Sequence, residues 1–147
     1  MKLTRYTDYA MRVLIHLAVS DGGLASIAEI ARAYDISQNH LMKVVQDLGG
    51  AGYVETLRGR NGGIRLGRPA DQINVGDLVR HTEAGFDLVD CANCLIAPAC
   101  GLPRVLNEAT AAFLAVLDKY TVADLVGRRT DLRALFGLPA GPLEAVL

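Results

Sequence analysis

Hydrophobic and polar positions follow a helical period through the first fifty residues of the chain. Apolar side chains recur every three or four positions between residues 4 and 19, which predicts an amphipathic helix that Thr4 caps. Ser26 and Glu29 have the spacing of a capping box and predict a short second helix. Ser37 is placed to cap a third helix. This third helix would bury four apolar side chains, Leu41, Val44, Val45 and Leu48.

A β-hairpin follows the third predicted helix. Two short apolar runs at residues 53–57 and 64–66 predict strands, and six residues rich in Arg and Gly join them. The order helix, helix, tight turn, helix and hairpin is typical of a winged helix-turn-helix. The sequence therefore predicts a mostly α-helical DNA-binding domain with a small β-hairpin wing over residues 1–70.

The second half begins with another capped helix, in which Asn74 precedes apolar residues up to position 82. A loop that contains all three cysteines follows, and residues 71–102 form a linking helix and cysteine loop. Pro103 then stands at the favoured first position of a long helix. We expect this dimerisation helix and a capped turn after it to span residues 103–126, and we assign no element to the tail at residues 127–147.

The long helix presents a wide apolar stripe. Its members are Val105, Leu106, Ala109, Ala112, Phe113, Val116, Leu117 and Tyr120. A chain of 147 residues has little left to cover such a stripe, so pairing with a second copy is the favoured solution. The alternative is that the stripe packs on the first helix of the same chain.

The composition is that of a globular protein with one domain, since 51% of the residues are hydrophobic and 21% are charged. Arg12 and His16 interrupt the first apolar stretch, which argues against a signal peptide or a membrane span and favours the cytoplasm.

The formal net charge of −1 hides an asymmetry between the two halves of the chain. Residues 1–70 hold nine Lys/Arg against six Asp/Glu, whereas residues 71–147 hold six against ten. Contact of the first half with a polyanion and chance scatter of surface charge explain this asymmetry equally well.

Two groups of polar residues are candidates for contact with duplex DNA. Asn and Gln can bond adenine in the major groove, Lys suits guanine or phosphate, and a capping Ser with free amides suits phosphate. Arg suits the narrow minor groove, and glycines let the backbone approach a duplex closely. The candidates are Ser37, Gln38, Asn39, His40 and Lys43 on the third helix and Arg58, Arg60, Asn61, Gly62 and Gly63 at the hairpin tip.

Each group also has an alternative interpretation. The polar residues of the third helix could form a solvated face, which is the commoner fate of such residues, but the flanking elements favour groove reading. The hairpin tip could hold a nucleotide phosphate, but the lysine and the following Ser/Thr of a P-loop are absent.

Cys91, Cys94 and Cys100 lie within ten residues and predict metal or redox chemistry. An iron–sulfur cluster with three thiolates and one weaker ligand is favoured over structural zinc, which needs a fourth ligand and a second knuckle. A small thiol-redox or electron-transfer protein is a remote alternative, because the helix and βαβ setting of thioredoxin-type exchange are missing. The three histidines lie on separate elements without a partner nucleophile, so we predict no enzyme.

Seven sequence blocks occur in order along the chain. They are Leu-Thr-x-Tyr-Thr-Asp-Tyr at 3–9, Asn-His-Leu-x-Lys at 39–43, Ala-Gly-Tyr-Val at 51–54, Arg-Gly-Arg-Asn-Gly-Gly-Ile-Arg-Leu-Gly at 58–67, Leu-Val-Asp-Cys at 88–91, Ile-Ala-Pro-Ala-Cys at 96–100 and Asp-Lys-Tyr-Thr-Val-Ala-Asp-Leu-Val at 118–126. In these blocks the chain resembles the NsrR type of nitric-oxide-sensing iron–sulfur repressor, within the winged-helix regulator family that includes IscR. The block at 58–67 is the most specific of them.

The resemblance implies a homodimer in which Cys91, Cys94 and Cys100 hold a [4Fe–4S] or [2Fe–2S] cluster and Asp8 of the partner subunit supplies the fourth ligand. It also implies a repressor whose affinity for double-stranded operator DNA falls when nitric oxide reacts with the cluster. Two residues separate the first two cysteines, fewer than is usual in the family, whereas the five residues before Cys100 match. A rival with the same fold senses iron supply, cluster status or general oxidation.

Overall fold

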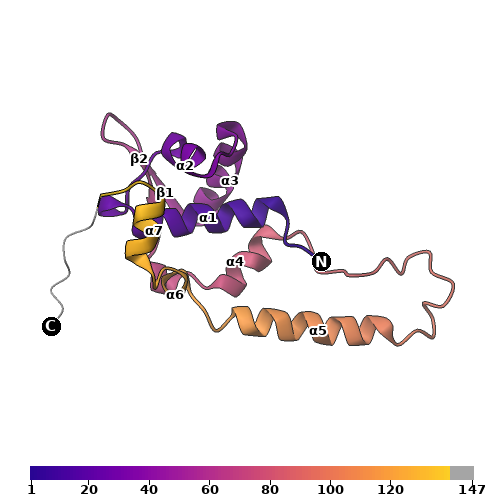
Figure 1. The fold of residues 1–147 in the computed structure, drawn as a ribbon. Coiled ribbons are helices and arrows are strands. Elements are labelled where there is room, and N and C mark those ends of the chain that lie inside the picture. Colours follow the sequence, from indigo (N-terminus) through magenta and orange to yellow (C-terminus); the bar gives the residue numbers. More distant parts are fainter. Residues whose placement is uncertain (140–147) are drawn as a thin grey trace.

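The computed structural model describes residues 1–139, which form a helical body with a hairpin at one edge and a long helix along another (Figure 1). The helices are α1 (Arg5–Val19), α2 (Ile27–Tyr34), α3 (Gln38–Gly50), α4 (Val75–Thr82), α5 (Leu102–Leu117), α6 (Val122–Leu125) and α7 (Arg129–Leu135), and the strands are β1 (Val54–Leu57) and β2 (Gly63–Leu66). This order confirms the predicted mostly α-helical fold with a β-hairpin wing. Among these described helices, none is long and apolar enough to span a lipid bilayer.

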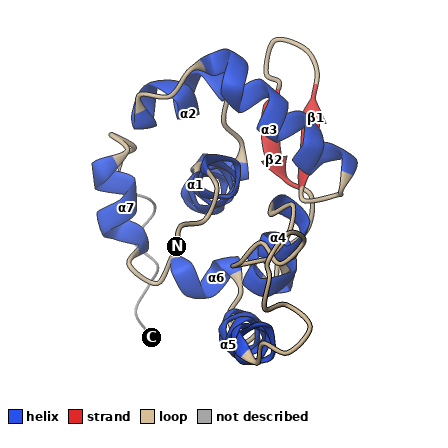
Figure 2. Cartoon of the chain, turned by 90° about the vertical axis from the view of Figure 1, so that its right-hand side faces the viewer, coloured by secondary structure: helices blue, strands red, loops and turns tan. Residues whose placement is uncertain are grey.

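Helix α1 forms the centre of the body, and α2, α3, α4, α6 and α7 surround it (Figure 2). Thr4 caps α1 as predicted, because its hydroxyl accepts from the Thr7 amide at 3.3 Å. The inward side chains Val13, Leu14 and Leu17 are fully buried. Burial of one such side chain contributes about 1.5–3 kcal/mol, so a single chain supplies a substantial core for its N-terminal half.

Helices α2 and α3 meet at a tight turn. Ser26 and Glu29 form the predicted capping box at the start of α2. The helix ends at Tyr34, and Asp35 directly after it has a left-handed backbone (φ 54°) that starts the turn. Ser37 caps α3 by accepting from the His40 amide at 3.4 Å. The predicted core side chains of α3 are all at most 4% exposed: Leu41, Val44, Val45 and Leu48.

Strands β1 and β2 pair antiparallel, with Val54 opposite Leu66. Ala25, just before α2, also pairs with Ile64 through backbone hydrogen bonds of 3.0 and 2.8 Å. The inward residues Val54 and Ile64 are 3% and 2% exposed. The wing therefore extends from a base that is fixed to the helical body.

Helix α5 leaves the body as an arm and lies along α4 (Figures 1 and 2). Arg80 on α4 donates two hydrogen bonds, of 2.5 and 2.8 Å, to the Asp118 carboxylate just past the end of α5. Asn74 donates to the Asp118 carbonyl at 2.8 Å. Gly76 lies so close to Asp118 that a Cβ would overlap the carboxylate. These contacts fix the C-terminal end of α5 to α4.

The apolar stripe of α5 is only partly covered. None of the 16 residues within α5 is buried, and Val105 and Val116 are 50% and 49% exposed. In the described chain α5 packs chiefly against α4. The alternative in which its apolar stripe packs on α1 of the same chain is therefore wrong. Residues 122–125 of the predicted dimerisation segment form a separate short helix, α6, which begins with a capping box at Thr121.

Part of the C-terminal tail, to which the sequence assigned no element, forms α7 and docks on α1. Arg129 and Arg133 each donate at 2.5 Å to one of the last two carbonyls of α1. A helix end leaves such carbonyls without an intrahelical partner, so α7 supplies the donors that they need. Phe136 packs against His16 with ring centroids 4.5 Å apart. Residues 140–147 of the tail lie outside the described residues.

Candidate nucleic-acid interface and cysteine loop

Helix α3 presents a polar face to solvent on the side opposite its buried residues. The five side chains that the sequence predicts to contact DNA from this helix are all exposed: Ser37, Gln38, Asn39, His40 and Lys43. His40 also makes a packing contact, because its ring stands edge-on to Tyr9 of α1 with centroids 5.5 Å apart. Within this set, the other four side chains have no such ring contact in the described chain.

The tip of the wing is basic and exposed. Arg58 and Arg60 make no hydrogen bond or ion pair with any other residue in the range 1–139, and Asn61 is exposed beside them. By contrast, Arg65 on β2 is bound to Glu55 at 3.0 Å. The two arginines at the tip therefore have their full charge available for a polyanion.

The glycines of the wing shape the turn. Gly59 has a φ of 106°, a backbone conformation that other residues rarely adopt. Gly62 and Gly63 are half-buried, and a Cβ on Gly62 would overlap the Leu57 carbonyl oxygen. The structure thus separates the ten candidates into side chains that face solvent and two glycines that hold the turn in place.

The three cysteines lie on the loop between α4 and α5, which extends away from the body (Figure 1). Cys94 is exposed, Cys91 and Cys100 are half-buried, and all three thiols are free. Backbone turns organise the loop: the Cys94 amide donates to the Cys91 carbonyl at 3.3 Å, and the Leu102 amide donates to Cys100 Sγ at 3.5 Å. A backbone N–H directed at sulfur is a feature that metal–thiolate sites use to orient and tune the ligand.

Asp8 lies on the helical body, in the first turn of α1. Its carboxylate oxygens accept from Arg12 at 3.0 Å, and its side chain is 48% exposed. No three Cys, His, Asp or Glu side chains of residues 1–139 converge into a metal site. Within residues 1–139 of one chain, therefore, the three cysteines do not form a metal site, either by themselves or together with Asp8.

The donor set nevertheless fits an iron–sulfur cluster. Three free thiols on one accessible loop are the ligands that such clusters require. Asp8 is held by an exposed ion pair, a type of contact worth only about 0–1 kcal/mol, so a stronger partner can displace Arg12.

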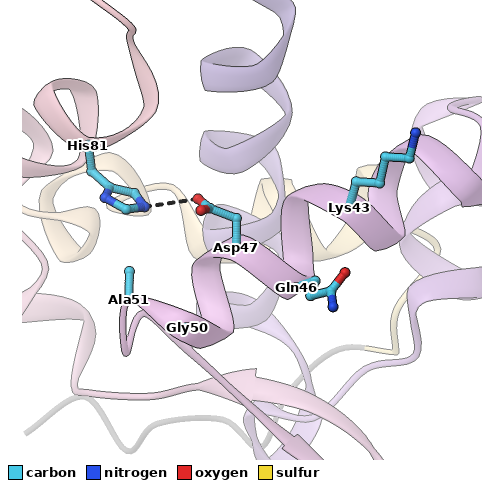
Figure 3. Close-up of a pocket in the computed structure, with 6 residues that line it drawn as sticks. All are labelled: Lys43, Gln46, Asp47, Gly50, Ala51 and His81. Atoms are coloured by element: carbon cyan, nitrogen blue, oxygen red, sulfur yellow. Dashed lines mark hydrogen bonds and ion pairs between the residues drawn. The ribbon is translucent and has the colours of Figure 1, made fainter.

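A hydrogen-bonded network that the sequence did not predict joins α1, α3 and α4. Asp47 on α3 accepts from the Tyr6 hydroxyl on α1 and from His81 Nε2 on α4, the latter at 2.9 Å (Figure 3). The Tyr6 hydrogen bond, with a smaller contribution from His81, holds the pKa of Asp47 below its usual range. The signal available in the sequence was an acidic residue on the helix that it predicts to contact DNA, because a negative charge there would oppose phosphate binding unless a neighbour compensates it.

Comparison with known sequences points to gene regulation. Residues 3–128 match the sequence profile of the Rrf2 family, described as iron-dependent transcriptional regulator. The chain is 57% identical over 141 residues to the HTH-type transcriptional regulator NsrR of Bacillus subtilis, and the alignment covers 92% of this chain and 97% of that relative. It is 53% identical to the NsrR of Bacillus licheniformis, over 92% of this chain and 99% of that relative.

Solved structures of regulators share the fold. CymR, the global cysteine regulator of B. subtilis, superposes with a TM-score of 0.67 at 28% identity, covering 87% of this chain and 98% of that one. IscR of T. potens superposes with a TM-score of 0.73 at 26% identity, covering 90% and 91%. The winged-helix fold is therefore common to this chain and to both regulators.

Proposed function

The chain belongs to the Rrf2 family of transcriptional regulators, and from this premise we propose that it is a dimeric repressor whose affinity for operator DNA depends on an iron–sulfur cluster that reacts with nitric oxide. The observation that carries the proposal is the combination, within one chain, of an uncovered polar face on α3, a basic wing and an exposed loop with three free cysteines. Similarity to the NsrR regulators of two Bacillus species supports the choice of signal.

The polar face of α3 and the wing have different roles in DNA binding. Gln38 and Asn39 lie in the first turn of α3, where a recognition helix meets base edges in the major groove. Lys43 lies one turn later and suits guanine or phosphate. Arg58 and Arg60 carry positive charge to the minor groove beside it. The helix then supplies most of the sequence specificity, and the wing supplies affinity.

Two copies paired through α5 form the DNA-binding unit. The helix is about 24 Å long at 1.5 Å per residue, and its stripe stays open along one side. A second copy related by two-fold symmetry covers the same stripe on both chains. The two recognition helices then read half-sites about 34 Å apart on a roughly palindromic operator.

Cys91, Cys94 and Cys100 would hold the cluster, and Asp8 of the partner subunit would complete its coordination. When bound, the cluster supplies iron that reacts with nitric oxide. The chain contributes an exposed loop that small molecules can reach, and a carboxylate that binds iron more weakly than a thiolate does. Arg12 holds Asp8 in position when no metal is bound.

Native mass spectrometry of protein purified without oxygen tests the proposal. We expect a dimer with two or four irons and matching sulfide per cluster, which a Cys94→Ser variant loses. Nitric oxide should then weaken DNA binding of the loaded dimer by about 5- to 150-fold, the usual range of allosteric coupling. A loaded dimer with the same DNA affinity before and after nitric oxide would refute the sensor and leave the DNA-binding regulator in place.

A second candidate keeps the fold and changes the signal to iron supply or oxidation. The description of the matching family as iron-dependent favours it. Release of DNA on iron chelation or exposure to oxygen, with no response to nitric oxide, would establish this candidate in place of the first.

A further inference from the structure

The residues that lead into the cysteine loop are hydrogen-bonded to α1 and α3. His81, in the last turn of α4, contacts the Asp47 carboxylate on α3, and Tyr6, in the first turn of α1, donates to the same carboxylate. Figure 3 shows the His81 ring pointing at Asp47, whereas Lys43 and Gln46 of the same helix point away from it. The Asp47 carboxylate thus connects α1, α3 and α4, and it has no hydrogen bond or ion pair with the outward side chains Lys43 and Gln46 of α3.

Glu83, directly before the loop, is bound to the start of α1. Its Oε1 accepts from the Thr4 amide at 2.7 Å and from the Thr4 and Thr7 hydroxyls at 3.1 and 2.7 Å. Partial burial raises the pKa of Glu83, but these hydrogen bonds outweigh it and hold the pKa below its usual range. The Oγ1 atom of the fully buried Thr7 also lies 2.7 Å from the Thr82 hydroxyl. The beginning of the loop is therefore fixed to the helical turn that carries Asp8.

Asp47 has a charge of the wrong sign for a helix that binds phosphates. The side chain is 46% exposed, and charges within a Debye length of about 8–10 Å still act on each other at physiological salt. An ion pair this exposed adds little to folding stability, so stability alone does not account for the acid. Its hydrogen bonds direct it toward α1 and α4, which indicates a role in holding α3 in position relative to them.

We infer that Asp47 is the positioning residue through which the cysteine loop sets the orientation of α3. A displacement of the loop acts first on His81 and Glu83, because these residues connect it to the body. His81 bonds Asp47 directly, and Glu83 holds the first turn of α1, whose Tyr6 bonds the same carboxylate. Both routes therefore end at Asp47. The inference rests on the proposed function, because it identifies how the loop controls DNA binding.

The first test uses metal-free, full-length protein. N-ethylmaleimide alkylates the loop cysteines and adds bulk there, and amide hydrogen exchange then reports on α3. We expect alkylation to speed exchange in the last two turns of α3 by about threefold or more in the wild type, and to have no such effect in Asp47→Asn. Equal acceleration in both proteins, or none in the wild type, would overturn the inference.

Asp71→Asn is the matched control. Asp71 is an exposed acid on the short turn before α4 and has no hydrogen bond to any other residue in the range 1–139, so its removal changes net charge alone. This control should respond to alkylation as the wild type does. A control that loses the response as Asp47→Asn does would assign the effect to charge and overturn the inference.

The second test uses the cluster-loaded dimer and measures DNA affinity before and after nitric oxide. The ratio of the two dissociation constants should be about 10 or more in the wild type and in Asp71→Asn, and near one in Asp47→Asn. His81→Gln keeps an N–H donor and should retain most of the ratio, whereas His81→Ala should not. A wild-type ratio near one defeats the proposed function, whereas a normal ratio that Asp47→Asn retains defeats this inference alone.

Discussion

Replacing Arg58 with Ala removes one of the two guanidinium groups at the wing tip. The side chain is exposed and has no hydrogen bond or ion pair within residues 1–139, so the free energy of unfolding should change by less than about 0.5 kcal/mol. DNA binding should weaken by about 1–3 kcal/mol, which is about 5- to 150-fold in the dissociation constant. A dimer loses one phosphate contact at each wing, so the log–log salt slope should become shallower by about 1.8.

Fluorescence anisotropy measures the dissociation constant and its salt slope. The protein is titrated at several salt concentrations into a duplex that was enriched by binding selection from a random-sequence library. Arg65→Ala is the matched control, because it removes the same charge from the same hairpin but from a side chain that is already bound to Glu55. Urea unfolding verifies that both variants fold. Equal DNA affinity of Arg58→Ala and wild type at matched salt, with an unchanged salt slope, would remove the wing from the interface.

Three further substitutions probe the fold. Gly62→Ala places a Cβ on the Leu57 carbonyl oxygen, so the free energy of unfolding in urea should fall by about 1–3 kcal/mol, and an unchanged midpoint would contradict this. Burial lowers the pKa of His16, so the contribution of the neutral ring to stability is complete above about pH 6.5 and is lost as the pH falls through the folded-state pKa. His16→Leu should therefore flatten the pH dependence of the urea midpoint between about pH 5 and 7. A pH profile identical to that of the wild type would argue against this role of His16. Arg80→Ala breaks the contact with Asp118 at the surface, so global stability should change little while amide exchange at the C-terminal end of α5 speeds up. Amides that stay protected there would show that other contacts hold the junction.

The elements that sequence predicted well are those with local signals. Ser26 and Glu29 lie three residues apart and form their capping box without help from the rest of the chain. Leu41 and Leu48 follow the helical period, and both are fully buried in α3. The hairpin was predictable for the same reason, because its turn residues lie between two short apolar runs.

The features that sequence missed depend on residues far apart along the chain. Helix α7 docks because Arg129 and Arg133 reach carbonyls of α1, more than a hundred positions earlier. Asp47 gains its role from Tyr6 and His81, which lie on two other helices. No local pattern encodes such contacts, since a hydrogen bond between distant residues leaves no periodic trace in the sequence.

The candidate site likewise has one part that the sequence predicted and one part that it did not. The type and clustering of the cysteines predicted their common loop, because all three lie within ten residues. Asp8 is paired with Arg12 within one chain, so its proposed role as a ligand rests on the family resemblance and not on the spacing of residues. In the proposed dimer the four ligands would come from two chains, and the sequence of one chain does not specify how two chains pack.

If the open stripe of α5 is the dimer interface, as proposed, the cellular concentration of the protein itself affects regulation. If a second copy covers Val105 and Val116 as proposed, operator occupancy follows the square of the protomer concentration when most protomers are single and the operator is far from saturated. A twofold fall in supply then lowers occupancy about fourfold, before any chemical signal arrives. In the proposed dimer, gene dosage and proteolysis would therefore also control operator occupancy, because they set how many chains are available to pair.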